Sequence, residues 1–176
     1  MTPLVLHVHP AETFPAPLSA RVVFFRAGEH WQLCYQIVTA AALVLPPPAA
    51  VPEFRDNLWQ HTCCEAFFAR ADGSYREYNL SPSGHWAAYD FRARRTGQTP
   101  RTDLPAPAIV CAPRADGFRL TTRLPVDAQA TRFALSLVLE TADGQCFHLA
   151  LAHPANKPDF HHPEAFRALP DDEART

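Results

Sequence analysis

TCCEAFFARADGSYREYNL, residues 62 to 80, is the clearest structural signal in the sequence, because it consists of two strand-like runs around a turn. The turn is Ala-Asp-Gly at residues 71 to 73, where Asp and Gly supply the positive φ that a tight hairpin needs. The runs on either side are rich in aromatic residues and alternate in polarity over part of their length. The stretch therefore predicts a β-hairpin.

Two registers of this hairpin compete, and they place different side chains on the same face. A two-residue loop puts Glu65 opposite Leu80, whereas a three-residue loop with Gly73 in the left-handed conformation puts Glu65 opposite Asn79. Only the second register separates polar from apolar side chains. It predicts one face made of Cys64, Ala66, Phe68, Tyr78 and Leu80, and another made of Cys63, Glu65, Phe67, Glu77 and Asn79.

The same signals recur along the chain. Ala-Asp-Gly occurs again at residues 115 to 117 and 142 to 144, each time between strand-like runs. The runs WQLCYQIV, FRLTTRL and RFALSLVLE alternate in polarity, so each has one dry face. The residues expected on these dry faces are Trp31, Leu33, Tyr35, Ile37, Phe118, Leu120, Leu124, Phe133, Leu135, Leu137 and Leu139. Shorter strands are expected near residues 22 to 26, 85 to 91 and 146 to 151.

These elements predict an all-β fold, an antiparallel β-sandwich of about eight to ten strands with a jelly-roll-like arrangement. Eighteen prolines spread along the chain leave no room for long helices, so few or no helices are expected. The proline-rich segments 40 to 56 and 96 to 108 are expected to be loops. A length of 176 residues suits one such domain, so residues 1 to 176 are expected to form a single sandwich.

Charge and cysteine usage limit the classes of partner. Sixteen Lys and Arg balance 18 Asp and Glu without a run of like charge, so neither nucleic acid nor an anionic membrane is an expected partner. The five cysteines lack metal-ligand spacing and are typical of reduced thiols in the cytoplasm. The N-terminus has no basic leader or long apolar segment, which agrees with a cytoplasmic location. The expected partner is a small molecule, with a protein partner as the other choice.

A polar face with aromatic neighbours is the candidate site. If the strand that contains Glu65 stays extended toward its start, Trp59 and His61 join Glu65, Glu77 and Asn79 on one face. Carboxylates and a carboxamide bond vicinal hydroxyl groups, and an indole ring covers the apolar face of a pyranose. Such a face suits a polyhydroxylated ligand. The alternative is a solvated outer face with one packed tryptophan.

LWQHTCCEAFF followed by YREYNLSPSGHWAAYDF resembles the DOMON-like group of domains related to family-nine carbohydrate-binding modules. The late segment LALAHPANKPDFHHPEAF looks like the C-terminal strand and closing loop of that group. The resemblance implies a jelly-roll-type sandwich that binds sugars or haem at one face. It also implies that Trp59 is a ligand-clamping aromatic residue and Glu65 a hydroxyl-binding carboxylate. The late segment has no tryptophan, so either Phe160 replaces the second clamp or that clamp is absent.

Together these features predict a non-catalytic module that binds a sugar or sugar derivative on a concave sheet face. A polar, proline-stiffened loop is expected to close the rim of the site. In the cytoplasm, a soluble sugar or glycan fragment is a more suitable ligand than a polysaccharide. The expected ligand-binding residues are Trp59, Glu65, Glu77, Asn79, Asn156, Asp159, Phe160 and His161.

Two other binding functions stay open. One is a haem-binding domain of the DOMON type, although Met1 is the only methionine and no haem attachment motif is present. A bis-histidine site, or a metal cluster, could be drawn from His61, His153, His161 and His162, but their spacing is no known zinc arrangement. The second open binding function is that of a protein-interaction domain that has lost its ligand. No cofactor is expected, and no Asp-rich loop marks a calcium site.

Catalysis is the remaining alternative. A glycosidase needs two carboxyl groups, and Glu65 and Glu77 supply them nominally, about 7 to 8 Å apart at the backbone. Nothing else in the sequence supplies an activated water molecule. Cys63 shares a face with His61, but the two are too close along one strand for a typical nucleophile and base. No catalytic residue or metal ligand is therefore assigned.

Overall fold

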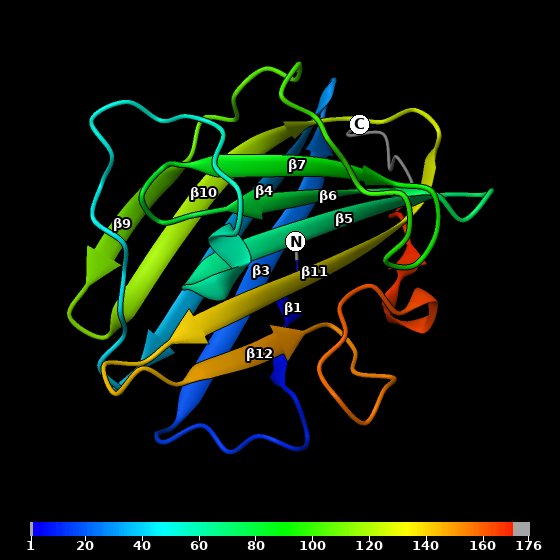
Figure 1. Cartoon of the computed structure of the whole chain (residues 1–176). Helices are drawn as coiled ribbons and strands as arrows, with labels where there is room; N and C mark the ends of the chain where they lie inside the picture. The colour runs from blue at the N-terminus through cyan, green and yellow to red at the C-terminus, as the bar shows by residue number, and fades with distance from the viewer. Residues whose placement is uncertain (1, 171–176) are drawn as a thin grey trace.

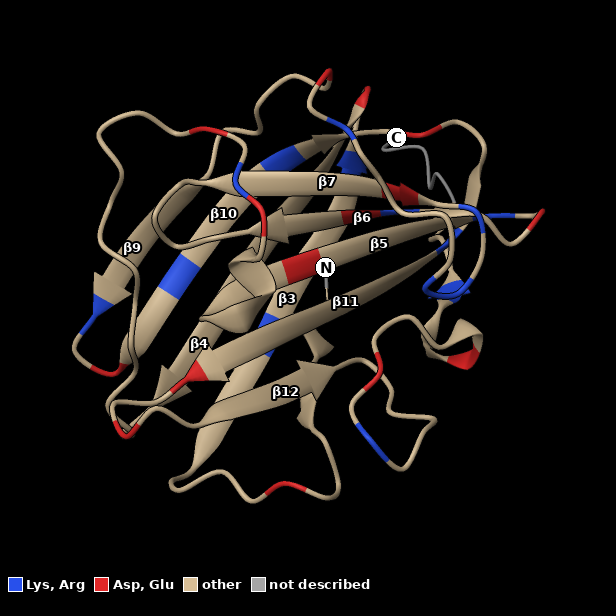
Figure 2. Ribbon diagram, in the orientation of Figure 1, with Lys and Arg blue, Asp and Glu red and all other residues tan. Residues whose placement is uncertain are grey.

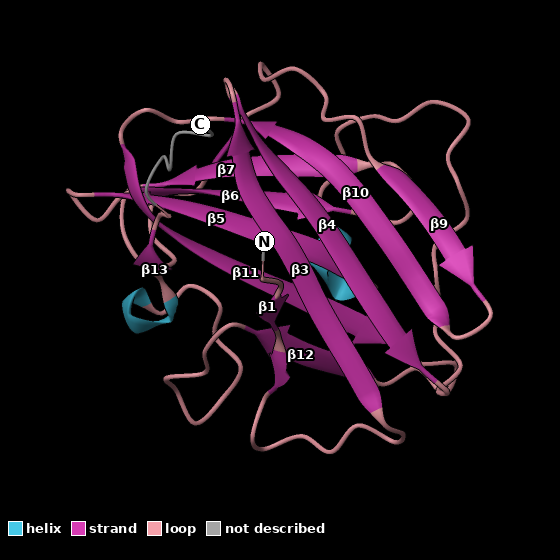
Figure 3. Cartoon of the chain, turned by 180° about the vertical axis from the view of Figure 1, so that it is seen from behind, coloured by secondary structure: helices cyan, strands magenta, loops and turns pink. Residues whose placement is uncertain are grey.

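Two antiparallel sheets pack face to face in the computed structural model, which describes residues 2 to 170 (Figure 1). The sheet seen from behind in Figure 3 has five strands. Their spatial order is β1 (Leu4–Val5), β3 (Leu18–Ala27), β4 (His30–Thr39), β10 (Gly117–Pro125) and β9 (Val110–Arg114). All pairings in this sheet are antiparallel.

The second sheet has eight strands and carries the candidate site. Seven of them follow the order β2 (His7–Val8), β12 (Cys146–Ala150), β11 (Ala130–Glu140), β5 (Cys63–Arg70), β6 (Tyr75–Leu80), β7 (Trp86–Phe91) and β8 (Thr99–Pro100). The eighth, β13 (Arg167–Ala168), pairs with β11. The described helices are two 3-10 turns, η1 (Leu58–Gln60) and η2 (Pro163–Ala165). Between residues 2 and 170, no helix is long and apolar enough to cross a membrane.

The predicted all-β sandwich is confirmed. Nine of the strands described have five residues or more, namely β3 to β7 and β9 to β12. Each of the three Ala-Asp-Gly segments joins two antiparallel strands, as expected. The segment 96 to 108 is not wholly a loop, because Thr99 and Pro100 add the short edge strand β8 to β7. Proline fits there since its missing N–H faces no further strand.

The hairpin of β5 and β6 has the register of the three-residue loop. Glu65 lies opposite Asn79, and Phe67 lies opposite Glu77. The Arg70 N–H donates to the Ser74 carbonyl oxygen at 2.8 Å, which closes the loop. Gly73 has a φ of 86°, the left-handed conformation that this loop requires. The predicted division of the hairpin into two faces is therefore correct.

One face of the hairpin forms part of the sandwich interior. Cys64, Ala66, Phe68, Tyr78 and Leu80 are buried in the main core, against side chains of the five-stranded sheet. The rings of Phe24, Trp31 and Phe133 stack there, with centroids 4.6 to 4.7 Å from Phe24. All residues expected on the dry faces of the long strands are buried. The core thus leaves the other face of the hairpin turned outward.

A second apolar cluster covers part of that outward face. Its buried members are Phe67, Ala69, Tyr75, Ala87, Tyr89, Phe91, Ala134 and Phe166. They come from β5, β6, β7, β11 and the C-terminal segment. The outer side of this sheet is therefore packed and partly enclosed, and the alternative of a plainly solvated face is wrong.

Candidate ligand-binding site

A cavity of about 350 Å³ lies on the outer side of the eight-stranded sheet. Its size falls within the range of small-molecule sites. Its polar lining consists of Glu65, Glu77, Arg95, Gln98, His148 and His161. Its apolar and aromatic lining consists of Trp59, Tyr89, Phe91, Val138, Pro158 and Phe160.

The floor of the cavity crosses five neighbouring strands, β7, β6, β5, β11 and β12 (Figure 1). Strand register places Tyr89 opposite Glu77 in the pairing of β6 with β7. It places Val138 opposite His148 in the pairing of β11 with β12. Strand β5, which carries Glu65, lies between β11 and β6, the strand that carries Glu77. The floor is therefore fixed by backbone pairing, and its side chains point outward by the period of two.

Trp59 lines the cavity, although not for the reason that the sequence suggested. The expected extension of the strand is wrong, because β5 begins only at Cys63 and η1 precedes it. Asn57, with a φ of 63°, starts this turn; its short polar side chain tolerates the left-handed conformation. The Trp59 side chain remains 49% exposed. His61 does not line the cavity, and its Nδ1 lies 2.8 Å from Glu140 Oε2.

Glu65 and Glu77 are the acidic groups of the floor, and their residues are only 2% and 5% exposed. Glu65 Oε2 accepts a hydrogen bond from the Ser136 hydroxyl at 2.8 Å. Burial, followed by repulsion from Glu77, raises the pKa of Glu65 to about 8. Burial also raises the pKa of Glu77 to about 7. Burial therefore favours the protonated forms of both carboxyl groups on the cavity floor.

Asn79 supports this pair without lining the cavity. It is fully buried, and its Nδ2 donates to Glu77 Oε1 at 2.7 Å. The Cys63 sulfur lies 3.8 Å from Asn79 Oδ1. Burial, then the charge of Glu65, raises the pKa of the Cys63 thiol well above its usual value, so this thiol is a poor nucleophile.

His161 closes one side of the cavity as a neutral ring. The Tyr75 hydroxyl accepts from the Arg95 N–H at 3.1 Å and is hydrogen-bonded to His161 Nδ1 at 2.7 Å. The other ring nitrogen of His161, Nε2, lies 3.8 Å from Glu77 Oε2. Burial, followed by the charge of Arg95, lowers the pKa of His161 to about 4.

Asp159 holds the closing loop in place. Its carboxylate accepts from Arg94 Nε at 3.0 Å, from Arg95 Nε at 3.1 Å and from the His161 N–H at 3.1 Å. Asp159 itself does not line the cavity, but its neighbours Phe160 and His161 do. Asn156 is exposed and lies outside the cavity lining. Of the eight expected site residues, the structure therefore gathers Trp59, Glu65, Glu77, Phe160 and His161 around one cavity.

This fold has counterparts among solved structures. A protein from Bacteroides uniformis ATCC 8492 that is proposed to bind carbohydrate superposes with a TM-score of 0.64 and 15% identity, over 95% of this chain and 84% of the other. A family-nine carbohydrate-binding module from Caldicellulosiruptor kristjanssonii, solved in complex with glucose, gives 0.51 and 12% identity, over 93% and 81%. The chain is similar in fold to a family-nine module. No family model and no curated protein sequence matches it.

Several cavity residues of this family-nine-like sandwich were not expected from the sequence. Tyr89 could have been found by continuing the hairpin register across the Ser-Pro-Ser-Gly turn, because it lies opposite Glu77. His148 could not be predicted from a local pattern, because its position depends on the distant residue Glu12, whose Oε1 lies 2.7 Å from His148 Nδ1. Arg95 and Gln98 reach the cavity from the loop after β7, and no local pattern marks them.

The histidines considered for haem or metal binding each have a separate hydrogen-bond partner. His153 Nε2 lies 2.7 Å from the His7 carbonyl oxygen, and His162 accepts from the Glu164 N–H at 3.3 Å. His61 pairs with Glu140, and His161 contacts Tyr75. Residues 2 to 170 contain no group of three or more His, Cys, Asp or Glu side chains arranged to hold a metal ion. Met1 lies outside the described residues.

Proposed function

We propose that this protein is a non-catalytic module that binds a sugar or sugar derivative in the cavity above β5 and β6. The observation that carries the proposal is the pair of buried carboxyl groups, Glu65 and Glu77, on a cavity floor with Trp59 half exposed at its side. The carboxyl groups would bond ligand hydroxyls, and the indole would cover an apolar sugar face. The glucose complex of the family-nine module supports this ligand class.

The finer parts of the proposal follow the same argument. We propose that the relationship extends to the DOMON-like group, with sugar as the ligand in place of haem. Asn79 and Asp159 would position Glu77 and the closing loop, and Phe160 would serve as the second aromatic wall. All five cysteines are free thiols, which supports a reducing, cytoplasmic location.

Tryptophan fluorescence tests the function directly. Trp31 and Trp86 are each 3% exposed, so Trp59 is the tryptophan that a soluble quencher or ligand reaches. The protein is titrated with mono- and disaccharides, sugar phosphates and haemin. A saturable change with one sugar class is expected, together with protection of Trp59 from acrylamide quenching.

Two variants make the test specific. Trp59→Ala should abolish the change and leave the melting temperature within a few degrees, because the side chain is half exposed. Val110→Ala, which truncates an exposed side chain on the other sheet, should bind like the parent protein. The absence of a fluorescence change with every sugar tested would favour the protein-interaction alternative. A stoichiometric Soret band with haemin that is lost in His161→Ala would favour haem binding. Hydrolysis of aryl glycosides that is lost in Glu65→Gln would contradict a non-catalytic role.

A further inference from the structure

The charges around the cavity are unevenly compensated. The cationic side chain Arg95 is paired with Asp159, its NH2 nitrogen lying 3.0 Å from Oδ1. His148 is paired with Glu12 at 2.7 Å. Glu65 and Glu77, in contrast, accept hydrogen bonds only from neutral side chains, Ser136 and Asn79. Among residues 2 to 170, these acidic groups are therefore members of the lining that make no hydrogen bond to a cation, although the charge of Arg95 acts on both.

The unused oxygen atoms of the two carboxyl groups are placed to receive a ligand. Glu65 is 2% exposed and lines the cavity, yet only its Oε2 accepts a hydrogen bond. At Glu77, Oε1 is used by Asn79, whereas Oε2 lies 3.8 Å from Nε2 of the neutral His161, beyond hydrogen-bond distance. Each group thus offers one free acceptor, Oε1 of Glu65 and Oε2 of Glu77. Figure 2 shows acidic segments on both β5 and β6, in the middle of the sheet.

We infer that this cavity selects an amino sugar, a sugar with a protonated primary amine, over neutral sugars. The inference rests on the proposed sugar-binding function and names the ligand class. At about pH 6 a neutral sugar would leave both carboxyl groups protonated, whereas a bound cation would pair with their ionised forms and so offset the cost of burying charge. An ammonium group has three donors and no acceptor, which matches two carboxylate oxygens on one floor.

Binding of a cationic ligand should also release protons from Glu65 and Glu77 to the buffer. Burial raises the pKa of both carboxyl groups, so the free protein holds protons on them at about pH 6. A bound ammonium favours the ionised forms and releases these protons to the buffer. The other groups near the pair are Arg95 and neutral His161 from the loops, Ser136 of β11, Asn79, the Cys63 and Cys64 thiols, and the hydroxyl groups of Tyr35, Tyr75 and Tyr89. None of these is a carboxyl group that would take up the released protons.

The test is titration calorimetry at about pH 6 with glucosamine, N-acetylglucosamine and glucose, in two buffers of different ionisation enthalpy. N-Acetylglucosamine is the matched control, because it retains the ring and the nitrogen but carries no charge. Glucosamine should bind about tenfold more tightly than either neutral sugar, the difference expected between charged and neutral hydrogen bonds. It should release about one proton or more per molecule bound, whereas the neutral sugars release none.

Glu65→Gln and Glu77→Gln should each lower the ratio of glucosamine affinity to glucose affinity and the proton release, in addition to any loss of glucose affinity from the missing carboxyl group. If one variant does not fold, the other variant and the N-acetylglucosamine control still decide the result. Equal affinity for the three sugars would overturn the amino-sugar inference and leave the proposed function intact. Absence of binding by all three would count against both.

Discussion

The Tyr75 hydroxyl group lies 2.7 Å from His161 Nδ1 and so joins β6 to a loop that is 86 residues away in the sequence. The same hydroxyl accepts the Arg95 N–H at 3.1 Å. Burial raises the pKa of Tyr75 to about 12, which keeps its proton in place. One phenol group thus holds both loops that close the cavity. The other ring nitrogen of His161, Nε2, lies 3.8 Å from Glu77 Oε2.

Tyr75→Phe should therefore loosen the site. The substitution removes the hydrogen-bond partner of His161 Nδ1 and the acceptor of the Arg95 N–H, at a cost of about 1 to 3 kcal/mol in the free energy of unfolding. Urea unfolding measures this loss, and fluorescence titration should show severalfold weaker ligand binding. Unchanged affinity in a folded Tyr75→Phe protein would mean that the loops need no such support.

Stability should fall as the pH rises from about 6.5 to 8. The folded-state pKa values of Glu65 and Glu77, about 8 and about 7, exceed the usual value of 4.5, so the folded protein binds more protons than the unfolded chain in this window. Each proton of difference lowers the free energy of unfolding by about 1.4 kcal/mol per pH unit. The pKa of His161 is lowered from 6.5, so this residue reduces stability only at lower pH. Melting curves across the window provide the measurement.

The double variant Glu65→Gln/Glu77→Gln serves as the control for this pH dependence. Glutamine keeps the size of the side chain and has no proton to lose. Its melting temperature should stay nearly flat from about pH 6.5 to 8. An equally steep decline in the double variant would assign the effect to other groups.

Asp159→Asn should weaken ligand binding severalfold without unfolding the protein. Its carboxylate is paired with Arg94 and Arg95, and although burial opposes ionisation, these partners lower its pKa. Neutralising it releases the loop that carries Phe160 and His161. Fluorescence titration gives the affinity, and circular dichroism reports folding.

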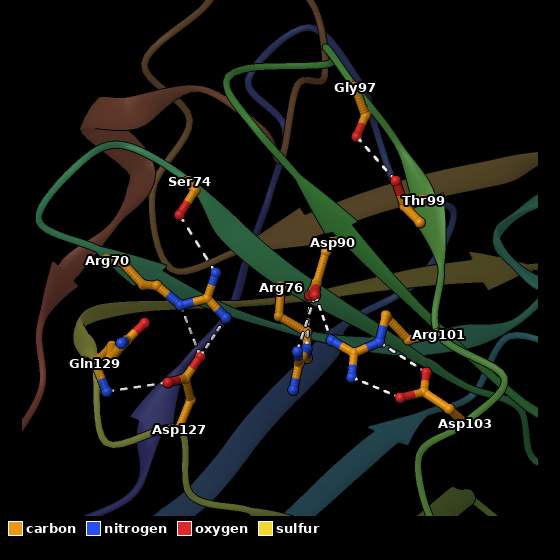
Figure 4. Close-up of polar contacts among 10 residues, drawn as sticks. All are labelled: Arg70, Ser74, Arg76, Asp90, Gly97, Thr99, Arg101, Asp103, Asp127 and Gln129. Carbon is orange, nitrogen blue, oxygen red and sulfur yellow. Dashed lines mark hydrogen bonds and ion pairs between the residues drawn. The ribbon is translucent and has the colours of Figure 1, made fainter.

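The matched control for Asp159→Asn is Asp103→Asn. Asp103 also pairs with an arginine, Arg101, which is linked through Asp90 to Arg76 in the cluster shown in Figure 4. This cluster does not line the cavity, and Asp103 is 66% exposed at its side chain. Its loss should leave both the affinity and the melting temperature essentially unchanged, because exposed ion pairs contribute little. Equal weakening by both variants would contradict a specific role for Asp159.

Two hairpin glycines should differ in their tolerance of alanine. At Gly73, with a φ of 86°, a Cβ atom would meet nothing within 4 Å, so Gly73→Ala should cost about 1 to 2 kcal/mol of conformational strain. At Gly117, with a φ of 140°, a Cβ atom would lie 2.1 Å from the Ile37 carbonyl oxygen. Gly117→Ala should therefore cost about 3 kcal/mol or more, because backbone must move. Equal losses in urea unfolding would contradict this ranking.

The sequence by itself determined the hairpin of β5 and β6 and the division of its side chains between two faces. This success has a local physical cause. The loop length fixes which residues are opposite, and the strand period of two fixes the face of every side chain. Glu65 and Glu77 were found in this way, and so were the dry faces of the long strands.

Tertiary structure alone decided how the cavity is completed. The pairing of β5 with β11 joins residues about 70 positions apart, and no local rule specifies it. The turn at Asn57 interrupted the expected extension of β5, yet Trp59 still reached the cavity. The loops that carry Arg95 and His161 meet through Tyr75 only after the sheet has formed. Burial of the two carboxyl groups, and hence their raised pKa values, results from this packing, because desolvation depends on every neighbour and is not encoded by any short segment.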